Sequence, residues 1–252
     1  MTLKWEIALN KFIKKWKAKK NVLGAVVAGS YATGTPSKYS DIDIYIVLSD
    51  DMKTRERGNR IIDGYLMEYF ANPVRQIKAY FKEEFEKNKS ITARMFATGK
   101  VLFDKKGDVK ALRKEAERWM RKKFRKPDKA SVEISKYSLW DDLDNLKELH
   151  SSKSVIFRFA YFFLLQEIMN VYSKYLQIEI VAPSKLLKYL TSEQFRKKYL
   201  LKEFPDKTFA RLFVKCLKKD DMGLIKNLTN YVLDKLGGFD IDGWKLRSRT
   251  TI

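Results

Sequence analysis

Two short aliphatic runs, and the connection between them, restrict the fold of this chain more than any other feature. Residues 22–28, VLGAVVA, and residues 41–48, DIDIYIVL, each have the length and the β-branched content of a buried strand. Side chains alternate across a strand, so Asp41 and Asp43 lie on one face of the second run and its isoleucines lie on the other. The sequence therefore predicts two strands with a pair of carboxylates over an apolar layer.

The chemistry of this carboxylate pair points to a divalent cation. Two like charges side by side must be protonated, solvated or neutralised, and paired carboxylate oxygens on a rigid strand suit Mg²⁺. Gly29 and Ser30 follow the first strand and open the turn-rich connection. Glycine allows close approach of a phosphate to the backbone, and serine adds a small hydroxyl at the start of a helical turn. We therefore expect a phosphate-binding turn beside a magnesium site.

This arrangement resembles the signature of the nucleotidyltransferase superfamily, which includes DNA polymerase β and the antibiotic nucleotidyltransferases. That signature is a hydrophobic strand, Gly-Ser or Gly-Gly, a short connection, and Asp-x-Asp within a second hydrophobic strand. Here it comprises Gly29, Ser30, Asp41 and Asp43. The resemblance implies two Mg²⁺ ions and a nucleoside triphosphate donor, most simply ATP. It also implies transfer of the nucleoside monophosphate to a hydroxyl, with release of pyrophosphate.

The same resemblance implies a third metal-binding carboxylate on a following strand. Glu68 is the favoured residue, because apolar neighbours enclose it in the run 64–71, GYLMEYFA. Asp63 is the fallback, at the polar entrance of that run. The two cannot serve together, because residues five apart on one strand have opposite side-chain parity.

The remaining pattern predicts an α+β fold with two domains. Residues 1–106 are expected to form the catalytic domain, a mixed sheet backed by helices, with a polar loop and a short helix over residues 49–60. Residues 107–252 are helical in pattern and are expected to form a bundle that binds the acceptor, with 153–176 as its central helix. This order of domains resembles kanamycin nucleotidyltransferase and related small-molecule enzymes.

Several charged residues of the helical domain are candidates for supporting roles. Asp141 and Asp142 are the favoured general bases, because they begin an acidic helical face and follow Trp140, which is suited to wall a pocket. A solvated helix face is the alternative for each of them. Lys185 lies at a helix start after Pro183 and is a candidate phosphate ligand, with a helix-capping role as the alternative.

Composition restricts compartment and partners. The formal net charge is +21, from 52 Lys and Arg against 31 Asp and Glu, which indicates either a polyanionic partner or a lysine-rich lineage. The single cysteine, Cys216, excludes a disulfide within the chain, and its apolar surroundings predict burial. The sequence has neither a signal peptide nor an apolar run long enough to span a bilayer, so we expect a cytoplasmic protein without membrane contact. A homodimer is compatible with these features.

The leading functional prediction is a metal-dependent nucleotidyltransferase that acts on a small hydroxyl-bearing acceptor such as an antibiotic. The high positive charge argues against a polycationic aminoglycoside unless the pocket is locally acidic. It would instead assist nucleotide addition to RNA or to another anionic acceptor, which is the first alternative. The second alternative is a non-catalytic, antitoxin-like module that binds a nucleotide or nucleic acid.

Overall fold

The computed structural model describes residues 3–247, which divide into two compact units. The first unit comprises the chain up to Lys122 together with Lys197–Leu201. The second comprises Lys123–Arg196 and the residues from Lys202 onward. The first unit holds a sheet with helices and the second is helical, which confirms the predicted α+β class.

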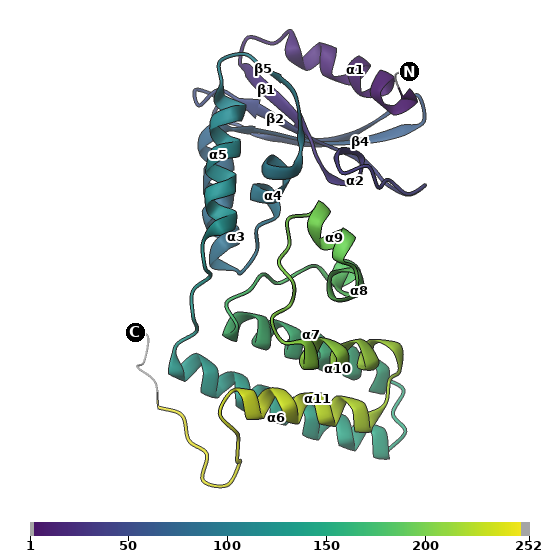
Figure 1. Cartoon of the computed structure of the whole chain (residues 1–252), viewed down its shortest axis with the longest axis vertical. Coiled ribbons are helices and arrows are strands. Elements are labelled where there is room, and N and C mark those ends of the chain that lie inside the picture. Colours follow the sequence, from purple (N-terminus) through teal and green to yellow (C-terminus); the bar gives the residue numbers. More distant parts are fainter. Residues whose placement is uncertain (1–2, 248–252) are drawn as a thin grey trace. The chain divides into compact units, whose positions relative to one another are not determined.

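A five-stranded mixed sheet with the strand order β3-β4-β2-β1-β5 forms the centre of the first unit (Figure 1). Strands β2 and β4 run parallel, and the other neighbouring strands are antiparallel. The two strands predicted from the aliphatic runs are both present, and nearly every residue in them is buried. The five strands are β1 (Val22–Val27), β2 (Ile42–Leu48), β3 (Glu56–Ile62), β4 (Tyr65–Pro73) and β5 (Lys100–Asp104).

Strand β3 differs from the structure predicted for its segment. The polar composition of residues 49–60 predicts a loop and a short helix, but residues 56–62 form an edge strand. Asp63 and Gly64 have positive φ angles of 50° and 81° and make the tight turn that pairs β3 with β4. An edge strand of an antiparallel pair has a solvated face and accommodates polar side chains, so composition alone did not reveal this one.

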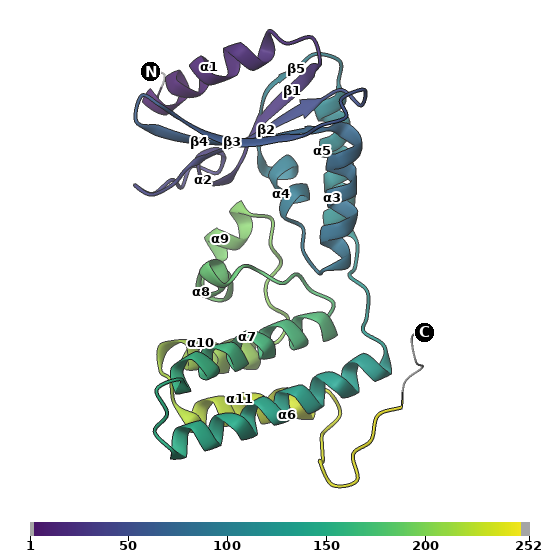
Figure 2. The same cartoon turned by 180° about the vertical axis from the view of Figure 1, so that it is seen from behind.

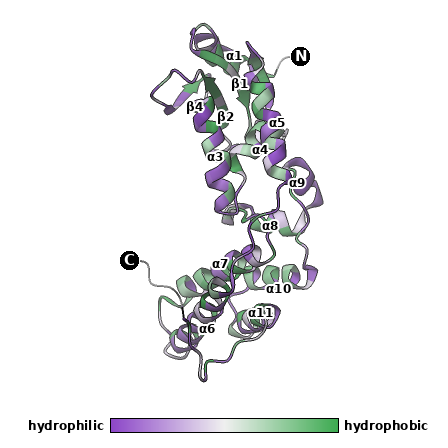
Figure 3. Ribbon diagram, turned by 90° about the vertical axis from the view of Figure 1, so that its left-hand side faces the viewer, coloured by the Kyte–Doolittle hydropathy of each residue, from purple (hydrophilic) through white to green (hydrophobic). Residues whose placement is uncertain are grey.

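Helices cover both faces of the sheet. Helix α1 (Lys4–Lys17) packs its apolar stripe on one face, where Ile42, Ile44 and Ile46 are fully buried (Figure 2). Helices α3 (Val74–Glu86), α4 (Ile91–Thr98) and α5 (Asp108–Arg121) pack on the other face against Tyr45 and Val47. In Figure 3, β1 and β2 are largely hydrophobic, whereas α3 and α5 also carry hydrophilic residues.

The first unit ends later in the chain than residue 106, where the sequence pattern placed the boundary. Helix α5 contacts α3, α4, β1 and β5, and its buried Val109 and Leu112 belong to the core on this face of the sheet. The strongly amphipathic pattern of α5 resembles the helices that follow it, so the sequence could not separate them.

The second unit consists of α-helices with short connections. Helices α6 and α7 pack together, and α11 packs on α6, α7 and α10. The segment 153–176, predicted as the central helix, forms α7, and on this helix Phe159 and Phe163 are 77% and 52% exposed. The helices after α5 are α6 (Lys129–Ser151), α7 (Phe157–Tyr175), α8 (Pro183–Thr191), α9 (Glu193–Lys198), α10 (Lys207–Lys218) and α11 (Met222–Lys235), and the last two residues of α9 belong to the first unit.

Candidate active site

Three carboxylates from two strands converge on the sheet face that also carries α3, α4 and α5. Asp41 directly precedes β2, Asp43 lies within β2, and Glu68 lies on the parallel strand β4. The register pairs Asp43 with Glu68, so their side chains lie beside one another on the same face. One oxygen from each carboxylate lies within 4.8 Å of the others, and all three residues are half-buried. The fallback, Asp63, lies in the β3–β4 turn and pairs instead with Lys11 at 2.7 Å.

This carboxylate set fits a divalent cation. Oxygen ligands on neighbouring strands of a hydrogen-bonded sheet are rigidly spaced, and carboxylate oxygens are the ligands that Mg²⁺ prefers. Three carboxylates so close together repel one another unless a cation neutralises them. The geometry therefore assembles the donor set expected of a metal centre.

Gly29 lies next to the carboxylate of Asp43. It adopts the left-handed backbone conformation, with φ at +66°, and begins the single turn α2 (Gly29–Ala32). A Cβ atom at this position would lie 1.9 Å from Oδ2 of Asp43. The backbone N–H of Ala28 also donates to the carbonyl of Asp43 at 2.8 Å. The absence of a side chain at residue 29 thus leaves room for the Asp43 carboxylate. The sequence had predicted a different role for this glycine, the close approach of a phosphate.

Ser30 is the second residue of this turn and is half-buried. Its carbonyl accepts from the N–H of Thr35 at 2.8 Å, which fixes the return of the chain toward β2. Tyr31, the next residue, is buried against Tyr65. Burial, together with the neighbouring Tyr65 and Asp41, raises the pKa of the Tyr31 phenol. Ser30 therefore lies on a turn anchored by packing at the end of β1.

Two residues of β3 adjoin the carboxylates and were not among the predicted site residues. Arg57 donates from Nη2 to Oε1 of Glu68 at 2.6 Å, and its guanidinium lies 4.8 Å from the ring centre of Phe70. Asn59 is the direct register partner of Glu68, so it lies on the same face. Residues 56–62, ERGNRII, show no alternation of polar and apolar residues, so the sequence held no local signal for these two residues.

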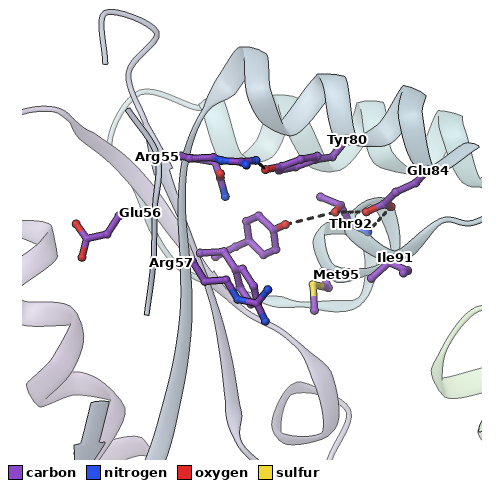
Figure 4. Close-up of a pocket in the computed structure, with 11 residues that line it drawn as sticks. Arg55, Glu56, Arg57, Tyr80, Glu84, Ile91, Thr92 and Met95 are labelled. Carbon is purple, nitrogen blue, oxygen red and sulfur yellow. Dashed lines mark hydrogen bonds between the residues drawn. The ribbon is translucent and has the colours of Figure 1, made fainter. Parts of the chain in front are cut away.

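A cavity of about 420 Å³ lies beside Arg57 (Figure 4). Arg57 of β3 and Arg55, which directly precedes β3, give the cavity a cationic rim. The stacked rings of Tyr45 and Phe70 form part of its lining, and residues of α3 and α4 complete it. The lining residues are Tyr45, Arg55, Glu56, Arg57, Phe70, Asn72, Tyr80, Glu84, Ile91, Thr92 and Met95.

Hydrogen bonds fix the inner end of this cavity. Glu84 accepts from the N–H of Thr92 at 2.7 Å and from its hydroxyl at 2.6 Å. The Tyr45 hydroxyl lies 3.3 Å from the same Thr92 oxygen. Burial raises the pKa of Tyr45 to about 12, so this phenol is neutral at physiological pH.

The other predicted site residues lie in the helical unit. Asp141 and Asp142 are half-buried on α6, and Asp141 accepts from Asn145 at 3.3 Å. Burial, with like charge from Asp141 and from Glu167 on α7, raises the pKa of Asp142. Lys185 lies in the first turn of α8. The structure thus places Asp142 near a further carboxylate that the sequence analysis had not linked to it.

Comparisons with known proteins bear on the sheet unit. Residues 9–126 match the family model described as nucleotidyltransferase domain. This match supports the nucleotidyltransferase superfamily, and with it a transferase activity that uses a nucleotide substrate. It spans all five strands and both carboxylate-bearing segments.

A solved structure of a nucleotidyltransferase-like protein from Exiguobacterium sibiricum is similar to this one at a TM-score of 0.46 and 9% sequence identity. The alignment covers 92% of this chain and 75% of that protein. No curated protein matches the sequence. Among the helices of residues 3–247, none is both long and apolar enough to cross a membrane.

Proposed function

We propose that this protein is a metal-dependent nucleotidyltransferase that moves a nucleoside monophosphate, most simply AMP from ATP, to an acceptor hydroxyl. In this reaction the hydroxyl oxygen forms a bond to the α-phosphorus of the triphosphate. The bond from that phosphorus to the bridging oxygen breaks, and pyrophosphate leaves with the electron pair. The hydroxyl proton passes to a base or to solvent.

The observation that carries this proposal is the convergence of Asp41, Asp43 and Glu68 within 4.8 Å beside the Gly29–Ser30 turn. The three carboxylates would hold two Mg²⁺ ions, which when bound neutralise charge on the triphosphate and favour ionisation of the attacking hydroxyl. The chain's own contribution is to space the carboxylates on two paired strands. Ser30 and the adjoining backbone N–H groups would bind phosphate oxygens.

The helical unit would supply residues that act on the acceptor. Asp142 is the favoured general base, with Asp141 as the alternative, because a raised pKa brings a carboxylate closer to the pH at which it accepts a proton effectively. Lys185 would contribute an ammonium group to a phosphate. A small hydroxyl-bearing molecule such as an antibiotic is the acceptor suggested by the order of the domains.

A second candidate acceptor is RNA or another anionic molecule. The net charge of +21 favours it, since a strongly basic protein attracts polyanions and repels polycations. Under either candidate the metal site and the donor are the same, so the two proposals differ only in the acceptor.

The deciding experiment measures metal binding and transfer on the same variants. Mn²⁺ is titrated calorimetrically into the wild-type protein, Asp43→Asn and the matched control Asp63→Asn, whose carboxylate pairs with Lys11 away from the site. Transfer from α-labelled ATP is then followed with panels of small-molecule and RNA acceptors. We expect Asp43→Asn to lose metal binding and to lose transfer by several powers of ten, while Asp63→Asn behaves as wild type. Equal Mn²⁺ affinity in all three proteins would refute the assignment of the site.

A further inference from the structure

The cavity adjoins the carboxylates along the direction of the strands. Tyr45 and Phe70, which line it, lie two residues beyond Asp43 and Glu68 on β2 and β4, and two residues along a strand return to the same face. The Gly29–Ser30 turn instead meets the carboxylates at Asp43, and it is not part of the cavity lining. A donor phosphate at the turn and a molecule in the cavity would therefore approach the carboxylates from different positions.

The rim of the cavity is cationic and aromatic. The Arg55 guanidinium contacts the Tyr80 hydroxyl, and its centre lies 5.8 Å from the centre of the Tyr80 ring. Arg57 lies across the cavity from Arg55 (Figure 4). The Arg57 guanidinium lies over the Phe70 ring and donates to the Glu68 carboxylate. Guanidinium groups of this kind bind phosphates through paired hydrogen bonds, and aromatic faces stack on planar rings.

The two acids of the lining are turned to other partners. Glu56 points to the opposite side of β3, where its carboxylate accepts from the Tyr69 hydroxyl (Figure 4). Both oxygens of Glu84 accept from Thr92. The positive charge at the cavity is therefore that of Arg55 together with Arg57, whose guanidinium pairs with Glu68 through one nitrogen and has further N–H groups for a ligand. This charge favours an anionic ligand and disfavours a cationic one.

We propose that this cavity binds the acceptor, and that the acceptor is a nucleoside phosphate. Its phosphate would be held by Arg55 and Arg57, its base would lie against Tyr80 or Phe70, and a ribose hydroxyl would point toward the carboxylates. A cavity of about 420 Å³ lies within the size range of pockets for molecules of this size. The role of the bound molecule as acceptor rests on the proposed function. Binding of a nucleoside phosphate in the cavity does not depend on it.

Binding is tested first without metal. AMP, adenosine and inorganic phosphate are titrated in EDTA into the wild-type protein and into Arg55→Gln, Tyr80→Leu and Lys53→Gln. Lys53→Gln is the matched control, because it removes an exposed positive charge two residues from Arg55 and outside the cavity lining. We expect Arg55→Gln to weaken AMP binding about tenfold and Lys53→Gln less than twofold, since a charge-assisted hydrogen bond is lost only in the first. Tyr80→Leu should weaken AMP binding more than it weakens phosphate binding, because only AMP has a base that lies against the ring.

The source of the nucleoside phosphate is resolved by comparing AMP with a short RNA ending in adenosine. Tighter binding of the RNA, with the same dependence on Arg55, would identify an RNA end, and equal binding would identify a free nucleotide. Equal effects of Arg55→Gln and Lys53→Gln on AMP would overturn the site, because only general electrostatics would then be at work.

The acceptor role is tested by transfer kinetics with Mg²⁺. Arg55→Gln should raise the KM for the acceptor nucleotide and leave the KM for ATP unchanged. A rise in the KM for ATP alone would overturn the proposal, because the cavity would then hold the donor. Failure of the proposed function is distinguishable, since Asp43→Asn and wild type would then both lack transfer while the metal-free titrations still report on the cavity.

Discussion

Replacement of Gly29 by alanine isolates the contact between the turn and the metal-binding carboxylates. The added Cβ would lie 1.9 Å from Oδ2 of Asp43 and 3.0 Å from its Cγ, where ordinary contact begins at 3.4 Å. The carboxylate must therefore turn away from the position that it shares with Asp41 and Glu68. The backbone at φ +66° adds about 1–2 kcal/mol of strain for any residue with a side chain.

The matched control is Gly34→Ala. Gly34 has nearly the same backbone conformation, with φ at +71°, but a Cβ atom there would meet no other atom within 4 Å. Both variants should lose about 1–2 kcal/mol of unfolding free energy, measured by denaturant titration. Only Gly29→Ala should lose Mn²⁺ affinity, by about 10–100-fold, as expected when a group that supports a metal ligand is disturbed. Equal Mn²⁺ affinities in the two variants would refute the view that Gly29 makes room for Asp43.

Three further predictions concern other carboxylates. Glu68→Gln should lower kcat far more than it weakens ATP binding, while Asp63→Asn should be near neutral; pre-steady-state transfer and nucleotide titration on both variants check this ranking. Asp206→Asn should lower the unfolding free energy by about 2 kcal/mol at pH 7, because the carboxylate accepts from two tyrosine hydroxyls and a backbone N–H. Although burial opposes it, these bonds lower the pKa of Asp206, so the loss should shrink as the pH falls below about 4, and a constant difference would contradict this origin. Asp142→Asn should raise the melting temperature at pH 7 and not at pH 3, because burial and like charge raise the pKa of Asp142 and the charged form is destabilising.

Strand β2, which holds Asp43 and follows Asp41, and its neighbour β1 were predictable because their signal is local. Residues 22–27 and 42–48 are rich in aliphatic, largely β-branched residues and are mostly buried on both faces, so composition alone identifies them. Asp41 and Asp43 follow from the alternation within one strand. Glu68 was predictable for a related reason, since a charged residue within an apolar run requires an explanation.

The surroundings of the carboxylates were not predictable, because they depend on which strands pair. Arg57 reaches Glu68 only because β3 is the antiparallel neighbour of β4, and the sequence pattern over residues 49–60 resembles a loop. The cavity forms because α3 and α4 pack over the sheet face that also carries the Arg57 side chain, and no local pattern encodes this packing. The assignment of α5 to the sheet unit likewise depends on packing against β1.

The burial of β4 and the position of its carboxylate have the same physical origin. Met67 and Ala71 are fully buried beneath α1, on the face opposite Glu68. A slip of one residue between β2 and β4 would bring Met67 beside Asp43 and would turn Glu68 into the apolar layer under α1. Burying an ionised carboxylate there without a partner would cost several kcal/mol, and exposing the methionine would lose about 2 kcal/mol of hydrophobic stabilisation. The hydrophobic packing of α1 therefore enforces the register that brings the third carboxylate to the other two.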